Sequence, residues 1–263
     1  MGISLEVNTK SPSDLSCEGN SPAPQRLTLA SYNIHRCYGR DGRCVPDRIV
    51  DVLREIRADV VALQEVETQA EGGIRILEAL ARETGSTMIP GPTMFRAGAQ
   101  YGNALLTRLP VKSVAQVDLS VAGREPRGAI DVRLDAGGAG ILRVCASHLG
   151  LRPSERRMQV KQLLVRLAAE PGDIDVLIGD INEWLLWGRP LRWLHRFFIK
   201  PPAPATFPAR WPLLALDRIW VRPRRRLERV FVHRSATARE ASDHLPVVAW
   251  LTPSAPAAGP AAS

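Results

Sequence analysis

Carboxylate, amide and imidazole side chains recur in this sequence at the points where strand-like segments end. Asn33 follows SY, Glu65 falls near the end of VVALQEV, and His148 falls near the end of ILRVCASHLG. Asp180 and Asn182 follow the apolar run DVLIG. Strand ends at one edge of a sheet sandwich can converge on a single cleft. This placement therefore predicts one polar site assembled from several strands.

Further residues of the same types stand in the C-terminal third. Asp217 lies in LALDRIWV, and Asp243 and His244 lie in SDHLPVVAWL, just before the last predicted strand. Hard divalent cations such as Mg²⁺ prefer the oxygen ligands that carboxylate and amide groups offer. The two histidines, His148 and His244, add groups that carry protons or donate hydrogen bonds near neutral pH. This inventory suits metal-assisted hydrolysis, in which a cation neutralises charge that builds on a phosphate.

Hydrophobic periodicity predicts the elements that would position these side chains. Apolar or alternating runs predict strands at 27–34, 59–66, 103–108, 111–119, 128–134, 141–148, 175–178, 215–222, 227–233 and 246–251. Helical spacing predicts helices over 46–56, 72–84 and 153–168. Because residues 103–148 leave no room for a helix after each strand, a doubly wound fold is disfavoured. Packed sheets with helices outside are favoured instead.

Composition narrows the class of protein and its partners. The 263 residues carry a formal net charge of +8, and nearly all of the basic residues are arginine. This balance fits a polyanionic partner, although an arginine-rich proteome would give the same charge. No secretory signal and no transmembrane segment is recognisable, and the cysteines lack zinc-site spacing, so a cytoplasmic protein is expected. Residues 1–25 and 253–263 are predicted to be a disordered leader and tail around one domain, 26–252.

The ordered set of short patterns is more specific than any of its members. SYNIH, LQEV, YGNALLTR, SHLG, GDIN, LDRI and SDHLP, taken in this order, resemble the endonuclease/exonuclease/phosphatase superfamily over about residues 27–251. Ser147 stands where Thr is usual and Ile181 where Phe is usual, and neither change removes a functional group. The resemblance implies an α+β fold: a four-layer α/β/β/α sandwich of two packed, mostly antiparallel sheets with outer helices.

The resemblance also implies a metal site and an activated water. Glu65 would be the principal metal ligand, with Asn33 beside it and Asp243 completing the metal and hydrogen-bond network. Asp180 would orient or deprotonate the attacking water, and Asn182 would hold that water or a phosphate oxygen. The implied cofactor is Mg²⁺, with Mn²⁺ as a possible substitute.

The remaining implied roles concern the phosphate. His244 would contact the scissile phosphate, with Asp217 fixing its tautomer and favouring its protonated form. His148 would donate a hydrogen bond to a phosphate oxygen as charge develops. Arg127, which lies between a proline and a strand, and Asn103 of YGNALLTR are the predicted phosphate-binding residues.

Three other segments are interpreted mainly as structural. Residues 183–202, EWLLWGRPLRWLHRFFIKPP, are predicted to form a helix that covers the sheet; the alternative is a lipid-interface or base-stacking element. Arg156 is predicted to be a solvated residue on the polar face of helix 153–168; the alternative is a cationic residue that contacts the phosphate. The RPRRR run at 222–226 is predicted to be a solvated turn between strands; the alternative is a contact with a polyanion.

The sequence therefore predicts a metal-dependent hydrolase of phosphodiesters, with two substrate classes open. SHLG resembles the deoxyribonuclease, sphingomyelinase and inositol-phosphatase branches, and the lack of a Tyr-containing motif there disfavours abasic-site repair. TFPARWPLLALDRI is similar to a bacterial branch of the superfamily. Nucleic acid is favoured over phospholipid, and the latter would bring peripheral membrane contact. A non-catalytic binding protein is disfavoured because no position of the implied site is lost.

Overall fold

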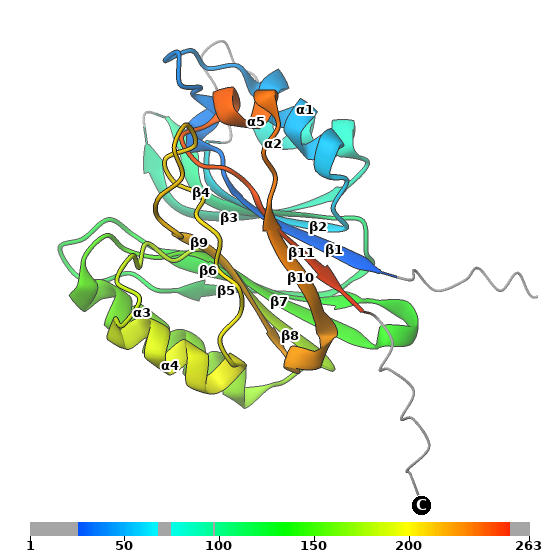
Figure 1. The fold of residues 1–263 in the computed structure, drawn as a ribbon, viewed down its shortest axis with the longest axis vertical. Helices are drawn as coiled ribbons and strands as arrows, with labels where there is room; N and C mark the ends of the chain where they lie inside the picture. Colours follow the sequence, from blue (N-terminus) through cyan, green and yellow to red (C-terminus); the bar gives the residue numbers. More distant parts are fainter. Residues whose placement is uncertain (1–25, 68–74, 97, 253–263) are drawn as a thin grey trace, which may run out of the picture.

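The protein consists of two facing β-sheets with helices on their outer sides, as seen in a computed structural model (Figure 1). The structure describes residues 26–67, 75–96 and 98–252. The predicted disordered leader (1–25) and tail (253–263) lie outside the described residues. Helices cover the outer face of each sheet (Figure 1). The predicted α+β four-layer sandwich is thus confirmed.

The first sheet has six strands in the order β10-β11-β1-β2-β4-β3. Among its described strands β1 and β2 pair in parallel, and the other neighbouring pairs are antiparallel. The carboxyl ends of β1 and β2 therefore meet at the same edge of this sheet. The strand bounds are β1 (Leu27–Asn33), β2 (Val60–Glu67), β3 (Thr87–Arg96), β4 (Ala99–Thr107), β10 (Leu227–Val232) and β11 (Val247–Leu251).

The second sheet has five strands in the order β5-β6-β7-β8-β9. Here β7 and β8 pair in parallel, and the other pairs that the structure describes in this sheet, β9 with β8 included, are antiparallel. The carboxyl ends of β7 and β8 thus lie beside the amino end of β9. The strand bounds are β5 (Val111–Asp118), β6 (Gly128–Asp135), β7 (Ile141–His148), β8 (Ile174–Asp180) and β9 (Asp217–Arg222).

Three apolar layers hold the sandwich together. One lies between the two sheets, a second lies between the first sheet and its helices, and a third lies between the second sheet and its helices. Strand β8 shows how alternation creates two of these layers, because Val176 and Ile178 face the first sheet while Leu177 faces the helices. The helices are α1 (Pro46–Ile56), α2 (Ile76–Thr84) and α5 (Ala236–Ala241) on one side, and α3 (Pro153–Ala169) and α4 (Arg189–Phe198) on the other.

The predicted elements match the observed ones closely within the described residues, with β3 and the short α5 as omissions, and residues 72–74 of the predicted helix 72–84 lie outside the described residues. Strand β3 contains Pro90 and Pro92, which disfavour a strand prediction because proline lacks a backbone N–H donor. It nevertheless forms at the edge of the sheet, the position where a strand tolerates proline. The RPRRR segment forms the predicted connection, a 3₁₀ turn over Arg224–Arg226 between β9 and β10.

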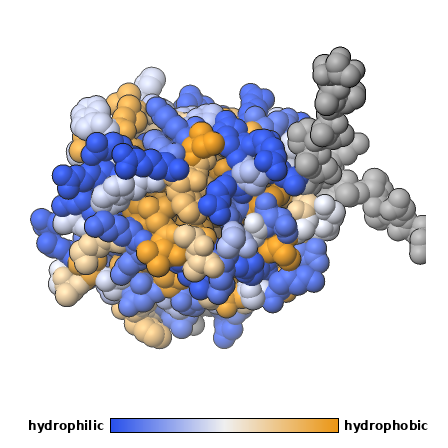
Figure 2. Space-filling view, turned by 90° about the horizontal axis from the view of Figure 1, so that it is seen from below, coloured by the Kyte–Doolittle hydropathy of each residue, from blue (hydrophilic) through white to orange (hydrophobic). Residues whose placement is uncertain are grey.

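The predicted helix within residues 183–202 is α4, which packs on the second sheet through Leu191, Leu194 and Phe198. Figure 2 shows the outer face that α3 and α4 form, with apolar side chains gathered near its centre among polar ones. Within the ranges that the structure describes, no helix combines the length and apolar character needed to cross a bilayer.

The prediction for Arg156 is wrong. Its side chain is 1% exposed and its Nε lies 3.2 Å from Glu183 Oε2, itself in a buried residue. Helical periodicity placed Arg156 on a polar face, but that face points at the loop that follows β8. The sequence pattern could not show that an acidic partner from this loop would lie there.

Gly179 allows β8 to lie beside β7 just before Asp180. Its φ of 144° is unfavourable for other residues, and an added Cβ would lie 1.8 Å from the Ser147 carbonyl oxygen.

We expect Gly179→Ala to lower the free energy of unfolding by more than about 2 kcal/mol, measured by urea denaturation. Gly138→Ala is the matched control, because a Cβ there meets no atom within 4 Å. Equal stability of the two variants would contradict this account.

Candidate active site

Three of the predicted site residues form one row across the second sheet. His148 on β7 stands opposite Asp180 on β8, and Asp180 stands opposite Asp217 on β9. Each lies two residues along its strand from a side chain that packs between the sheets: Ala146, Ile178 and Ile219. By strand alternation the three polar side chains therefore face the first sheet at its edge.

The first sheet contributes Asn33 and Glu65 to the same place. Asn33 ends β1 and is 1% exposed. Glu65 sits where the pairing of β2 with β4 shifts register between Leu63 and Val66, and its φ is 55°. A bulge of this kind turns a side chain away from the simple alternation of the strand. The Glu65 carboxylate consequently reaches Asn33, whose Nδ2 donates to Glu65 Oε1 at 3.1 Å.

The segment before β11 supplies the second histidine. Ser242 Oγ donates to the Asn33 carbonyl at 2.8 Å and accepts a bond from His244 N at 3.3 Å. His244 Nδ1 lies 2.8 Å from Asp217 Oδ2, which also accepts a 2.6 Å bond from Thr206 Oγ1. This chain of contacts links the two sheets across their shared edge.

The carboxylate of Asp180 lies at the centre of these contacts. Its Oδ2 accepts a bond from Asn33 Nδ2 at 3.2 Å and lies 3.6 Å from His148 Nε2 and 3.9 Å from His244 Nε2. Its Oδ1 accepts from the backbone N–H of Asn182 at 3.0 Å. Asp180 is 1% exposed, so these groups replace the water that would otherwise solvate its charge.

Burial shifts the pKa values of Asp180 and His148 in the directions that favour their neutral forms. The pKa of Asp180 is raised, first by burial and then by the negative charge of Asp217. The pKa of His148 is lowered to about 4, first by burial, since the attraction of Asp180 does not compensate for it. His148 is therefore a neutral imidazole near pH 7 and can donate a hydrogen bond without carrying charge.

The environment of His244 has the opposite effect. Burial favours its neutral form, but Asp217, through its charge and its hydrogen bond, and then Asp180 and Asp243 outweigh burial and raise the pKa of His244 to about 10. His244 is thus an imidazolium near neutral pH. With Nδ1 donating to Asp217, its Nε2–H is directed toward the Asp180 side, where an anionic group can be stabilised.

The other predicted site residues lie around this centre. The Asp243 side chain is 41% exposed, and its Oδ1 lies 3.8 Å from His35 Nδ1. Asn103 Nδ2 donates to the Gly128 carbonyl at 3.0 Å. Arg127 is 7% exposed and pairs with Glu125, while its Nε has no hydrogen-bond partner among the described residues. Its positive charge also lowers the pKa of His148, which places it electrostatically beside the row.

Sequence reasoning missed several supporting residues. Thr206 holds Asp217, Ser242 holds both Asn33 and His244, and the buried Arg156–Glu183 pair lies under the loops after β7 and β8. Ser242 is the first residue of the recognised pattern SDHLP, so its position was a usable signal. Nothing in the sequence around Thr206 indicated its partner, because the contact joins segments brought together only by the fold.

The residues present fit a divalent cation on the Glu65 side of the centre. Asp180, Asp217 and His244 offer ligand atoms within 4.8 Å of one another, but His244 is held in its protonated form by Asp217 and is a poor ligand. Glu65 and Asp180 instead direct carboxylate oxygens at the same Asn33 amide group. The two carboxylates offer the hard oxygen donors that such a cation prefers, whereas Asn33 presents its Nδ2 to them and its Oδ1 accepts from His35 N.

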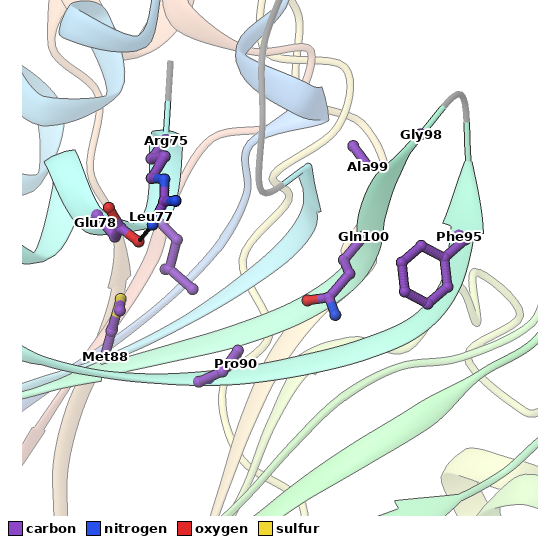
Figure 3. Close-up of a pocket in the computed structure, with 9 residues that line it drawn as sticks. All are labelled: Arg75, Leu77, Glu78, Met88, Pro90, Phe95, Gly98, Ala99 and Gln100. Atoms are coloured by element: carbon purple, nitrogen blue, oxygen red, sulfur yellow. Dashed lines mark hydrogen bonds and ion pairs between the residues drawn. The ribbon is translucent and has the colours of Figure 1, made fainter. Parts of the chain in front are cut away.

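A separate pocket of about 380 Å³ lies between α2 and the β3–β4 hairpin (Figure 3). Its lining includes Leu77 and Glu78 of α2, Met88 and Phe95 of β3, and Gln100 of β4. None of the predicted site residues lines it. The converging side chains at the sheet edge, and not this pocket, therefore define the candidate active site.

Comparison with known proteins agrees with this architecture. The Endonuclease/Exonuclease/phosphatase family model matches residues 30–244. The Escherichia coli K12 protein YbhP is 32% identical, over 74% of this chain and 84% of its own length. An endonuclease/exonuclease/phosphatase from Beutenbergia cavernae DSM 12333 is 25% identical with a TM-score of 0.71, covering 87% of this chain and 72% of that one. Humanized D. rerio TDP2 shares the fold at 16% identity and a TM-score of 0.62, covering 86% and 98%.

The chain belongs to the endonuclease/exonuclease/phosphatase family. Its general class is accordingly that of the phosphoester hydrolases. Enzymes of this family generally use divalent metal ions, and the buried acidic and histidine side chains at the sheet edge suit that chemistry.

The His244–Asp217 pair should give the metal-free protein a characteristic pH dependence. An unfolded His244 has a pKa of 6.5, whereas the folded value is about 10. Because folding raises this pKa, the pair stabilises the fold fully below about pH 6.5, and the stabilisation is lost as the pH rises through about 10. Urea midpoints measured in EDTA should fall over this interval. The fall in the urea midpoint should be smaller for Asp217→Asn. In His244→Gln the part of the fall that comes from this pair should be absent. Parallel curves of midpoint against pH for the parent and both variants would contradict this prediction.

Proposed function

We propose that residues 26–252 form a catalytic domain that hydrolyses phosphodiesters with Mg²⁺, which Mn²⁺ can replace. The observation that carries this proposal is the surroundings of the Asp180 carboxylate. On one side, the Asp180 carboxylate and Glu65 both accept hydrogen bonds from the Asn33 amide. On the other side, the Asp180 carboxylate lies near the neutral imidazole of His148 and the cationic imidazole of His244. Such a centre would provide a cation site, a base and two donors within one small volume.

Glu65 and Asn33 are proposed to hold the cation, with Asp243 completing the network. A bound Mg²⁺ would supply charge neutralisation at a phosphate oxygen. The left-handed backbone at Glu65 matters here, because it directs the carboxylate across the sheet edge to Asn33. Asn33 is fixed in turn through its carbonyl by Ser242 and through its Oδ1, which accepts from His35 N at 3.0 Å.

Asp180 is proposed to orient the attacking water and to accept its proton. The raised pKa of Asp180 makes its carboxylate a stronger base than a solvated aspartate. Asn182 is held beside it, because its N–H donates to Asp180 Oδ1 and its Nδ2 donates to the Leu149 carbonyl at 2.9 Å. With Nδ2 occupied, Oδ1 is the atom by which the Asn182 side chain would contact that water.

The two histidines are proposed to act on the phosphate in different ways. His244 is an imidazolium fixed by Asp217, so its Nε2–H can stabilise negative charge as the transition state forms. The neutral His148 can donate a hydrogen bond to a second phosphate oxygen. Arg127, directly before β6 of the second sheet, and Asn103, on β4 of the first sheet, are proposed to contact the substrate phosphate.

Nucleic acid is the substrate that the sequence favours, and the net charge of +8 supports it. A second candidate, a phosphodiester presented by a lipid surface, is favoured by large apolar side chains that lie exposed on the loops beside the site. Both candidates use the same hydrolytic centre. They differ in whether the protein surface around that centre contacts a nucleic acid or a lipid surface.

The first test of the proposal is the metal requirement. Hydrolysis of bis(4-nitrophenyl) phosphate should vanish in EDTA and return with Mg²⁺ or Mn²⁺, because the carboxylates alone cannot neutralise the phosphate charge. Glu65→Gln should raise the Mg²⁺ concentration needed for half-maximal rate by at least about 10-fold, following the loss of one ligand charge. Glu78→Gln, an exposed change on α2, is the control. Full activity of metal-depleted protein would refute the proposal.

The second test is a double-variant cycle at Asp180 and His244. Asp180→Asn and His244→Ala should each lower kcat on the order of 10²–10⁴-fold, because both groups act on one transition state. The double variant should be little slower than the poorer single variant, since the effects of groups that act as a unit do not add. Asp217→Asn should cost less, because Asp217 acts through His244. Near-normal turnover by Asp180→Asn would show that this carboxylate is only structural.

A further inference from the structure

Six large apolar side chains on the loops that border the active site are more than half exposed. We call them the apolar rim: Leu151, Trp184, Leu186, Trp187, Trp211 and Leu213, with exposed fractions from 58% to 79%. Single exposed apolar residues are common on proteins, but a group gathered around one site marks an interaction surface.

The rim loops are continuous with the catalytic row. The first, 149–152, follows His148 directly, and the second, 181–188, follows Asp180. The third, 206–216, leads into Asp217 and begins at Thr206, which bonds that aspartate. Since these three row residues are neighbours at one sheet edge, the rim lies around the mouth of the site.

Buried polar contacts hold the first two loops in place. The Arg156 guanidinium donates to the Leu151 carbonyl at 2.6 Å and to the Gly150 carbonyl at 3.2 Å, and it pairs with Glu183 at 3.2 Å. Glu183 Oε1 in turn accepts from Leu185 N at 3.2 Å. The backbone beneath Leu151 and Trp184 is therefore fixed, and the apolar side chains point outward from an anchored base.

The third loop is fixed in a similar way. Phe207 and Leu214 form a bridge, and Ala209 N donates to the Asp243 carbonyl at 2.7 Å. Trp211 and Leu213 lie inside the turn that this bridge closes, and they are 69% and 79% exposed. The chain thus exposes both side chains on a closed turn anchored next to the site.

The charges on these loops have one sign. Arg152, Arg189 and Arg210 are exposed on or directly beside the rim loops. The single acidic residue within loops 149–152, 181–188 and 206–216 is Glu183, which is buried and paired with Arg156. Exposed tryptophan and leucine side chains flanked by arginine are typical of surfaces that enter the headgroup region of an anionic bilayer.

We propose that the apolar rim docks the active-site edge on an anionic lipid bilayer, so that the phosphodiester reaching Asp180 is that of a phospholipid headgroup. Half of the rim consists of leucine side chains, which offer no ring for a nucleic-acid base to stack on. Leucine and tryptophan together are suited to the boundary between headgroups and acyl chains. The choice of substrate rests on the proposed function, whereas the docking itself is independent of catalysis.

The docking is tested with vesicles of phosphatidylcholine alone or mixed with phosphatidylglycerol, using the metal-free full chain so that nothing is hydrolysed. The chain should co-float with the mixed vesicles, and its tryptophan emission should shift to shorter wavelength. The double variants Leu186→Ser/Trp187→Ser and Trp211→Ser/Leu213→Ser should each weaken binding on the order of 10-fold or more. Replacing each of Arg152, Arg189 and Arg210 by Gln should cost roughly 5-fold per arginine.

Two control variants test the location of the surface. Val165→Ser on the outer face of α3 and Val114→Ser on edge strand β5 remove apolar side chains that are 73% and 45% exposed, and both should bind vesicles like the parent. All rim variants should keep the parent rate with soluble bis(4-nitrophenyl) phosphate, because no rim residue belongs to the hydrolytic centre.

Three results would overturn the docking proposal. One is the absence of vesicle binding; another is binding that Val165→Ser abolishes and the rim variants do not affect. The third is loss of oligonucleotide binding in the rim variants without any vesicle binding, which would assign the rim to nucleic acid. Failure of the proposed function has a different signature, since it would leave vesicle binding intact while no phosphodiester is cleaved.

Discussion

The burial of the Asp180 carboxylate is the constraint on which the active-site edge depends. A carboxylate that is 1% exposed is stable only if other groups replace its lost hydration. Asn33 from the first sheet, His148 from the neighbouring strand and His244 from the segment before β11 all contribute to this. Each comes from a different part of the chain, so the carboxylate is accommodated only when the two sheets are packed together.

This arrangement gives the two histidines of the site, His148 and His244, different charges near neutral pH. His148 has no carboxylate in hydrogen-bond contact and is deeply buried, so desolvation dominates and its pKa is low. His244 is equally buried but bonds directly to Asp217, whose own position is fixed by Thr206. The buried Asp217 carboxylate at 2.8 Å is thus the main difference between the neutral His148 and a His244 that is cationic near neutral pH.

Much of the fold could be predicted from the sequence because apolar periodicity is a local property. The strands around Asn33, His148 and Asp180, and the helix that begins at Pro46, appear where alternation or helical spacing placed them. Strand β3 was missed because its prolines contradict strand propensity, and only its place at the sheet edge makes them acceptable. Arg156 was misassigned because its partner Glu183 is 27 residues away in the sequence.

The sequence by itself determined the residue types of the site and the strand ends that present them, since both depend on neighbours along the chain. It also determined the family, through seven short patterns in a fixed order. The tertiary structure alone decided that Asp180 shares Asn33 with Glu65, that a bulge turns Glu65 inward, and that the apolar rim surrounds the site. These features depend on distances between segments far apart in the chain, which are fixed only when the sheets pack and the loops are anchored.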